Sequence, residues 1–395
     1  MSENIETNFI ININEELVIN PSIYKNMSEN IDKPENKVLK FTLQNVDVSI
    51  ANSIRRIILS EIPVVILDSL DKENIEDENI KIYENNSILN NEIIKQRLSC
   101  IPVCINDIEN FEYKNYVVEC NVKNNTNEKM IVTSGDLKIK NTISDEYLPT
   151  EEVNNIFRKN VVTNEFIDLL YLQPSFNEQN YEKIHFECGF NISDAKKNGS
   201  YNVASTCVYS FTKNETEIQK KWKSMEEKLP QNKEARELAY NDFMNLDAER
   251  ITIPNSYDFK VQSIGIYKNN ELVVLACEIM IQKFLNFIKL LESSDDYIKP
   301  NLELMENAYN VKLENEDYTF GKVLENMMYL MFFLREKKLN YVSLKKNHPH
   351  DNYSLLMIAY KNKEIKMEEI VSDLKNISEL NIEVYQNIKS NMTKV

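Results

Sequence analysis

The stretch FTLQNVDVSIANSIRRIILSEIP at residues 41–63 constrains the fold of this chain more than any other. Asp47 or Ser49 can cap a helix by accepting hydrogen bonds from the free amides of its first turn, and Pro63 cannot continue that helix. The sequence therefore predicts a helix over roughly residues 48–61. Apolar residues recur along it at intervals of three, four and seven, which predicts one wide stripe against a core, formed by Ile50, Ala51, Ile54, Ile57 and Ile58.

Three polar residues of the same helix, Asn52, Arg55 and Arg56, fall together on another face. Two arginines on an amphipathic helix usually form a solvated edge. A contact with a partner protein is the other interpretation, and only the neighbouring sequence favours it.

This neighbouring sequence resembles the assembly motif of the alpha-like subunits of cellular RNA polymerases. The matching residues stand in the order and spacing of that family: Phe41, Asn45-Val46-Asp47, Ala51-Asn52, Arg55-Arg56 and Glu61-Ile62-Pro63. A second match, NSILNNEIIKQRLSCIPV at residues 86–103, has Ser99-Cys100 where the family usually has Gly-Leu. It keeps the Arg97-Leu98 pair of the family segment.

A third segment, at residues 257–291, is similar to the strand and long helix that complete the dimerisation domain of this family. Gly265 permits a backbone geometry that a larger residue resists just after the strand. On physical grounds alone the apolar spacing predicts a buried helix of about 20 residues. Its stripe contains Leu272, Leu275, Ile279, Phe287 and Leu291.

The last hundred residues resemble a second, shorter member of the same family, which eukaryotic polymerases encode as the separate small subunit 11. The resemblance rests on residues 317–360, with His348-Pro349-His350 in a turn between two strands. One helix is predicted to begin near Phe320, and a closing helix is predicted from Met367 to Met392. The apolar face of the first of these helices contains Phe320, Leu324, Met327, Met331 and Leu334.

The resemblance implies an α+β fold in which two alpha-like dimerisation units, each an antiparallel sheet with long helices, form a pseudo-twofold dimer within one chain. The predicted parts are an N-terminal extension (1–35), a discontinuous subunit 3-like domain (36–107 and 250–295), an inserted mainly-β domain (108–249) and a subunit 11-like domain (296–395). Residues 9–20 could add a strand. Abundant Asn, Ile, Lys and Tyr, with the fusion itself, predict a large cytoplasmic DNA virus as the source. The predicted location is the cytoplasm, with the nucleus as the alternative.

The same resemblance implies a non-catalytic assembly platform for a multisubunit DNA-directed RNA polymerase. Asn52, Arg55 and Arg56 would dock the second-largest subunit, and Thr319, Gly321 and Glu325 would meet the largest. Small polymerase subunits are further expected partners. The predicted internal dimer interface contains Phe41, Ala51, Ile54, Ile58, Leu275, Ile279, Phe320, Leu324, Met327 and Met331.

Composition excludes several other function classes. Only 5 glycines are present, and neither the P-loop nor the dinucleotide-binding pattern occurs, so we expect no nucleotide cofactor. A net charge of −16 argues against direct binding of nucleic acid, which needs Lys and Arg at phosphates. Cys100 and Cys104 flank a proline, and Cys120, Cys188 and Cys207 are scattered, so no zinc site is predicted. No apolar run of membrane-spanning length occurs.

No sequence pattern for catalysis is present either. His348 and His350 lie near Asp351, but two histidines in a polar turn are usually surface residues. Two alternatives to a polymerase subunit stay open: a free-standing structural or adaptor protein with the alpha-like fold and, more remotely, an enzyme whose site lies in the inserted region.

Overall fold

The structure is a computed structural model, and it describes most of the chain. The described ranges are 22–25, 38–67, 80–105, 107–108, 110–160, 163–174, 181–229, 232–293, 297–301, 305–362 and 364–393. The strand predicted near residues 9–20 lies outside these ranges, as does most of the predicted N-terminal extension. None of the described helices is both long enough and apolar enough to span a membrane.

The first sheet joins strands from distant parts of the chain. Its antiparallel order is β1 (Ser22–Lys25), β2 (Leu39–Gln44), β11 (Thr252–Ser263) and β10 (Ala204–Lys213). Helix α2 (Val48–Ser60) packs against β10, and α7 (Asn269–Ser293) packs against β11. The predictions for both helices are confirmed, although α7 is longer than expected. Gly265, between β11 and α7, has a φ of +110°, as its position after the strand suggested.

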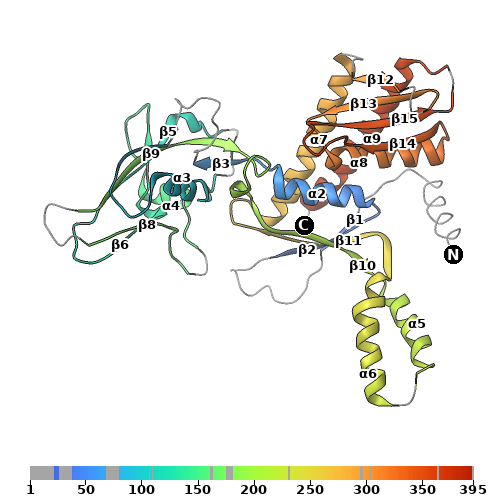
Figure 1. Cartoon of the computed structure of the whole chain (residues 1–395), viewed down its shortest axis with the longest axis horizontal. Helices are drawn as coiled ribbons and strands as arrows, with labels where there is room; N and C mark the ends of the chain where they lie inside the picture. The colour runs from blue at the N-terminus through green and yellow to red at the C-terminus, as the bar shows by residue number, and fades with distance from the viewer. Residues whose placement is uncertain are drawn as a thin grey trace.

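The second sheet repeats the same plan in the last hundred residues. Its antiparallel order is β12 (Ile298–Pro300), β13 (Ala308–Glu314), β15 (Tyr353–Tyr360) and β14 (Leu339–Lys345). Helix α8 (Tyr318–Met328) follows β13 as α2 follows β2, and α9 (Met367–Thr393) follows β15 as α7 follows β11. Figure 1 shows this unit in orange and red beside the blue helix α2. The predicted closing helix is therefore confirmed.

We call the first sheet with α2 and α7 the first unit, and the second sheet with α8 and α9 the second unit. Both units enter their first helix through the same turn. Asn45 and Asn315 adopt left-handed backbone conformations, with φ of 61° and 57°, which asparagine tolerates better than most residues. Two residues later, Asp47 accepts a hydrogen bond from the Ser49 amide, and Asp317 accepts one from the Thr319 amide. Of the two caps considered for α2, Asp47 is thus the one used, and an Asn-x-Asp sequence makes the turn in each unit.

The end of the first helix in the second unit departs from the predicted α-helical periodicity. After α8 the chain continues as a π-helix, η6 (Tyr329–Arg335), in which the backbone bonds span five residues. This wider turn rotates the apolar face by about one position. Phe332 is consequently the buried residue, while Met331 is half-buried against the core and Leu334 is also only partly buried.

One continuous core lies between the two sheets and contains helices of both units. In it α7 packs along α9, and α2 packs against α8. Seven residues of the predicted internal interface are buried there, namely Phe41, Ala51, Ile54, Ile58, Phe320, Leu324 and Met327. Leu275, Ile279 and Met331 pack against the same core half-buried. The rings of Phe284 and Phe320 join the units at a centroid distance of 4.7 Å.

A second core is formed by the residues between α2 and β10. It contains a sheet of β3 (Val64–Leu67), β9 (Lys183–Ser193), β5 (Tyr116–Lys123) and β7 (Lys138–Asn141), with β4 (Ile80–Asn85) also paired to β9. The two-stranded sheet of β6 (Met130–Thr133) and β8 (Asp168–Leu172) and the helices α3 (Asn91–Ser99) and α4 (Thr150–Ile156) complete it. Short 3₁₀ turns occur at Tyr113–Asn115, Ser134–Asp136 and Gly199–Tyr201.

The boundaries between the two cores differ from the predicted domain boundaries. Residues 64–107 were assigned to the first domain, but β3 and β4 pair with β9, so most of this segment belongs with the second core. Strand β10 was assigned to the insertion but pairs with β11 in the first sheet. Strand β3 joins the two cores because its alternate side chains point to opposite faces: Val64 and Ile66 face the first core, and Val65 and Leu67 face the second.

A helical projection separates β10 from β11. It contains α5 (Glu215–Glu226), α6 (Lys233–Asp242), the π-helix η4 (Phe243–Asp247) and the 3₁₀ turn η5 (Ala248–Arg250), and Figure 1 shows it extending away from both sheets. A small cluster of Ile218, Phe243 and Ala248 holds it together, with Trp222 packed on its edge.

Candidate assembly interface

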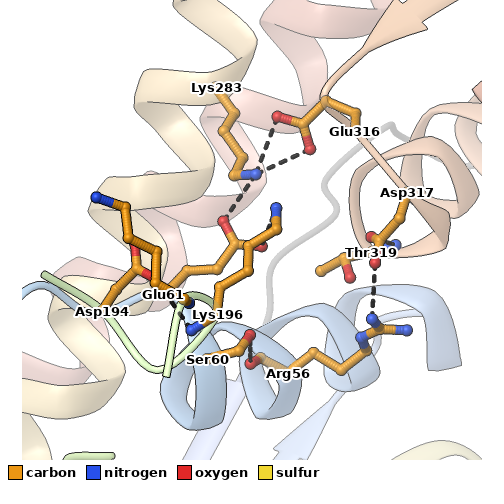
Figure 2. Close-up of polar contacts among 10 residues, drawn as sticks. Arg56, Ser60, Glu61, Asp194, Lys196, Lys283, Glu316, Asp317 and Thr319 are labelled. Carbon is orange, nitrogen blue, oxygen red and sulfur yellow. Dashed lines mark hydrogen bonds and ion pairs between the residues drawn. The ribbon is translucent and has the colours of Figure 1, made fainter. Parts of the chain in front are cut away.

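Arg56 and Asp317 form an ion pair where the C-terminal part of α2 meets the start of α8. Arg56 Nη2 donates to Asp317 Oδ2 at 2.7 Å, and the two side chains are 38% and 28% exposed (Figure 2). Burial alone would raise the pKa of Asp317, but the Thr319 hydrogen bonds and the Arg56 charge outweigh it and hold the pKa below its usual value. The residue that caps α8 therefore also ties α8 to α2.

A second set of charges, which we name the ion cluster, consists of Glu61, Lys283 and Glu316. Lys283 Nζ on α7 lies 2.8 Å from Glu61 Oε2, at the C-terminal cap of α2, and 2.8 Å from Glu316 Oε2, in the turn before α8 (Figure 2). It also donates to Glu316 Oε1 at 2.9 Å. The three side chains are only 13–20% exposed, so the cluster joins three elements of both units in a largely dry position.

Burial and mutual attraction act in opposite directions on these groups. Burial alone would lower the pKa of the Lys283 ammonium, but Glu316 and Glu61 outweigh it and the pKa is raised. Burial raises the pKa of Glu316, Lys283 offsets only part of this effect, and the nearby Glu61 carboxylate raises the pKa further. The single ammonium thus holds two carboxylates, with Lys196 Nζ 3.8 Å from Glu61 as a more exposed addition.

The predicted docking face on α2 has a different arrangement from the one expected. Arg55 donates to Asn52 Oδ1 through Nε at 3.1 Å and through Nη2 at 2.8 Å, so these two partly exposed residues are already paired within their own helix. Arg56 was predicted to be left for an outside partner. The structure instead directs one of its nitrogens to Asp317, because the start of α8 lies within reach.

A hollow of about 530 Å³ opens beside this face, between the N-terminal part of α2 and α8. Asp47 and Asn52 line it from α2 and its cap, and Lys322, Glu325 and Tyr329 line it from α8 and η6. Two residues that were assigned to different partners, Asn52 and Glu325, therefore lie on one recess.

The other two residues predicted to meet the largest subunit lie inside the chain. Thr319 is only 3% exposed. Gly321 is buried under Leu344, so that a Cβ at this position would lie 2.6 Å from Leu344 Cδ1. Gly321 thus serves the packing of α8 on β14, and Glu325, the third residue, is 17% exposed and pairs with Lys322.

The ion cluster was not foreseen from the sequence. Glu61 was noted only as part of the Glu-Ile-Pro motif, and Lys283 and Glu316 were not singled out. One signal could have located Glu316, because the Asn-x-Asp turn at residues 45–47 recurs at 315–317 with Glu316 in the middle position.

The remaining candidate residues have simple surroundings. Within the described ranges, no three His, Cys, Asp or Glu side chains are grouped so that they could hold a metal ion. Burial raises the pKa of the Cys120 and Cys207 thiols to about 12, which disfavours the thiolate that binds metals. His348 and His350 are exposed in the turn between β14 and β15, where His348 Nδ1 accepts from the His350 amide.

Residues 40–284, more than half of the chain, match the RNA polymerase Rpb3/Rpb11 dimerisation domain. The chain belongs to this family. The matched range contains α2 and most of α7, and it ends before the second sheet begins.

Individual relatives align with this chain over shorter stretches. A conjugation stage-specific protein of Tetrahymena thermophila is 32% identical over 189 residues, covering 44% of this chain and 55% of the relative. The RNA polymerase II subunit rpb3 of Dictyostelium discoideum is 31% identical over 120 residues, covering 27% and 36%. The RNA polymerase subunit Rpo3 of Pyrococcus furiosus is 35% identical over 112 residues, covering 27% and 38%. The chain thus spans about half, or less, of the length of these relatives.

Proposed function

We propose that this chain is a non-catalytic assembly subunit of a multisubunit DNA-directed RNA polymerase. Membership of the Rpb3/Rpb11 dimerisation family and the relatives named as polymerase subunits support this role. The observation that carries the proposal furthest is the repetition of one plan: two sheets with the same strand order, each with the same helix entry, share one core in one chain.

We further propose that the two units correspond to a subunit 3-like part and a subunit 11-like part fused in one chain, with the second core as a domain inserted into the first part. The matching Asn-x-Asp turns and the packing of α7 along α9 support a pseudo-twofold arrangement. A tether converts pairing into an intramolecular step with an effective concentration on the order of millimolar. The viral source and the cytoplasmic location stay predictions.

The docking surfaces follow from the residues that the internal contacts leave accessible. Arg55, paired with Asn52 within α2, is partly exposed, and its planar guanidinium can bind carboxylates or carbonyls of the second-largest subunit. Glu325, which lines the recess and is 17% exposed beside Lys322, is the remaining candidate for the largest subunit. Arg56 contributes to docking only with the nitrogens that Asp317 does not use.

Arg55→Ala tests this assignment without breaking the ion pair of Arg56. We expect the variant to fold with the native circular dichroism spectrum and to lose most of the second-largest subunit in co-purification from cells. Lys389→Ala is the matched control, because it removes a surface cation that pairs α9 with Glu278 of α7. Equal recovery of the second-largest subunit with the Arg55 and Lys389 variants would refute the docking role.

A further inference from the structure

The ion cluster occurs at only one end of the contact between the two units, although the units share one plan. If β2 is aligned with β13 through the Asn-x-Asp turns, Val46 takes the place of Glu316. Met331 takes the place of Glu61 by count, or Phe332 if the extra residue of η6 is allowed for, and both are apolar. The buried positions of α7 recur at equal intervals in α9, with Leu272, Cys277, Phe284 and Leu291 matching Asp373, Ser378, Tyr385 and Met392. In this alignment Val384 takes the place of Lys283.

The three counterparts of the ion cluster are therefore all apolar. Val46 and Val384 are 3% and 2% exposed, and Met331 packs half-buried against the same core. The ion pair of Arg56 with Asp317 is likewise one-sided, because Asn326 stands in the place of Arg56 and lines the recess with Asp47. One end of the contact is thus charged and paired, and the other end is apolar or open.

This asymmetry decides which pairs of units are compatible. In a pair of two second units, Glu316 of each would face the valine and methionine counterparts, and a buried carboxylate would have no cation. Asp317 would also face asparagine in place of arginine. In a pair of two first units, Lys283 and Glu61 would face Val46 and would lack the second carboxylate. Only the pairing of a first unit with a second unit satisfies every charge.

We infer that Glu61, Lys283 and Glu316 form the specificity determinant that selects pairing of the first unit with the second unit and rejects pairing of like units between chains. Glu316 is the principal residue, because it makes pairs of two second units unfavourable. Since both units are present in equal numbers, every pair of two first units leaves two second units that can pair only with each other. The inference rests on the proposed two-unit arrangement. It adds a reason why neighbouring copies of the chain do not associate through like units during folding.

The pairing can be measured on the full chain cut once between its units. A specific protease site is placed between Ser293, the end of α7, and Ile298, the start of β12. After cleavage the nicked chain is unfolded in urea and refolded, and native mass spectrometry counts pairs of unlike and like pieces. For the native sequence we expect unlike pairs almost exclusively.

Glu316→Val gives the second unit the side chain that the first unit has at Val46. We expect like pairs to rise at least about tenfold over the native chain, since the unpaired buried carboxylate no longer penalises them. The triple variant with Glu61→Met, Lys283→Val and Glu316→Val makes the ion-cluster positions alike at both ends, leaves the Arg56–Asp317 pair in place and should raise like pairs further. The triple variant also tests the inference if the single variant refolds poorly, because a protein usually stays stable when a buried ion cluster is replaced by apolar side chains.

Glu314→Val is the matched control, since Glu314 is half-exposed on β13 and pairs with Lys312 of its own strand. It should leave the pair composition native. Unlike pairs alone in both Glu316 variants would overturn the inference. A native chain whose pieces pair at random, or do not pair at all, would overturn the two-unit arrangement as well. Binding of the large polymerase subunits is a separate measurement, so loss of that binding with native pairing would count against the proposed function alone.

Discussion

Lys283→Met is the substitution that examines the ion cluster most closely. Methionine keeps a long, unbranched side chain that can pack where the lysine stem packs, so the main loss is the charge. The variant leaves Glu61 and Glu316 near each other, 13% and 20% exposed, with no ammonium between them. Removing one partner of a fully buried ion pair costs about 3–5 kcal/mol, and partial access of water here reduces the expected loss to about 2–3 kcal/mol.

The assay is urea denaturation followed by far-UV circular dichroism at neutral pH. Lys220→Met is the control, because Lys220 is 72% exposed and pairs with Glu217, which is 44% exposed and lies three residues earlier on α5. It should change the free energy of unfolding by no more than about 0.5 kcal/mol. The apolar triple variant at positions 61, 283 and 316 should recover most of the stability lost in Lys283→Met, because it leaves no charge uncompensated.

Two results would refute this reasoning. If Lys283→Met were no less stable than Lys220→Met, the two carboxylates would not depend on the ammonium. If the triple variant were less stable than Lys283→Met, the charges themselves, and not their compensation, would stabilise the contact.

Two further predictions concern the entry to α8. Gly321→Ala should destabilise the chain by about 1 kcal/mol in thermal unfolding, because the clash of a Cβ with Leu344 exceeds the gain in helix propensity; a rise in melting temperature would contradict this. Asp317→Asn keeps the cap but weakens the Arg56 contact, at a cost of about 1 kcal/mol at neutral pH. The pKa of Asp317 in the folded state lies below 3.8, the ordinary value of an aspartate. The difference in stability between the two proteins should therefore be fully present above pH 3.8 and vanish as the pH falls through the lower, folded-state pKa. A difference that does not change with pH would contradict this prediction.

The local parts of the fold were predictable because their signals lie within a few residues. The Asp47 cap, the apolar interval of α2 and Pro63 together predict a helix whose ends agree with the structure within one residue. Helix α9 was predictable for the same reason, since its apolar residues keep one period over 27 residues. The π-helical turn at Phe332 was not, because apolar side chains crowd every face of residues 329–334 and their spacing does not mark the change of period.

The boundary between the two cores needed contacts over long sequence distances. Strand β3 is four apolar residues, a pattern that fits several environments, and only its pairing with β9 assigns it to the second core. The candidate site shows the same limit. Arg55 and Asn52 interact within one helix and could be grouped from spacing, whereas Glu61, Lys283 and Glu316 come from three distant segments, and each alone is typical of a solvated charge.

The most direct test of the proposed function is affinity purification of the full chain from its natural source under native conditions. The account predicts that two subunits above about 100 kDa travel with the chain in fixed stoichiometry, and that the purified assembly makes RNA from a DNA template. A chain that arrives without these subunits and without that activity would contradict the assignment and would favour a free-standing adaptor.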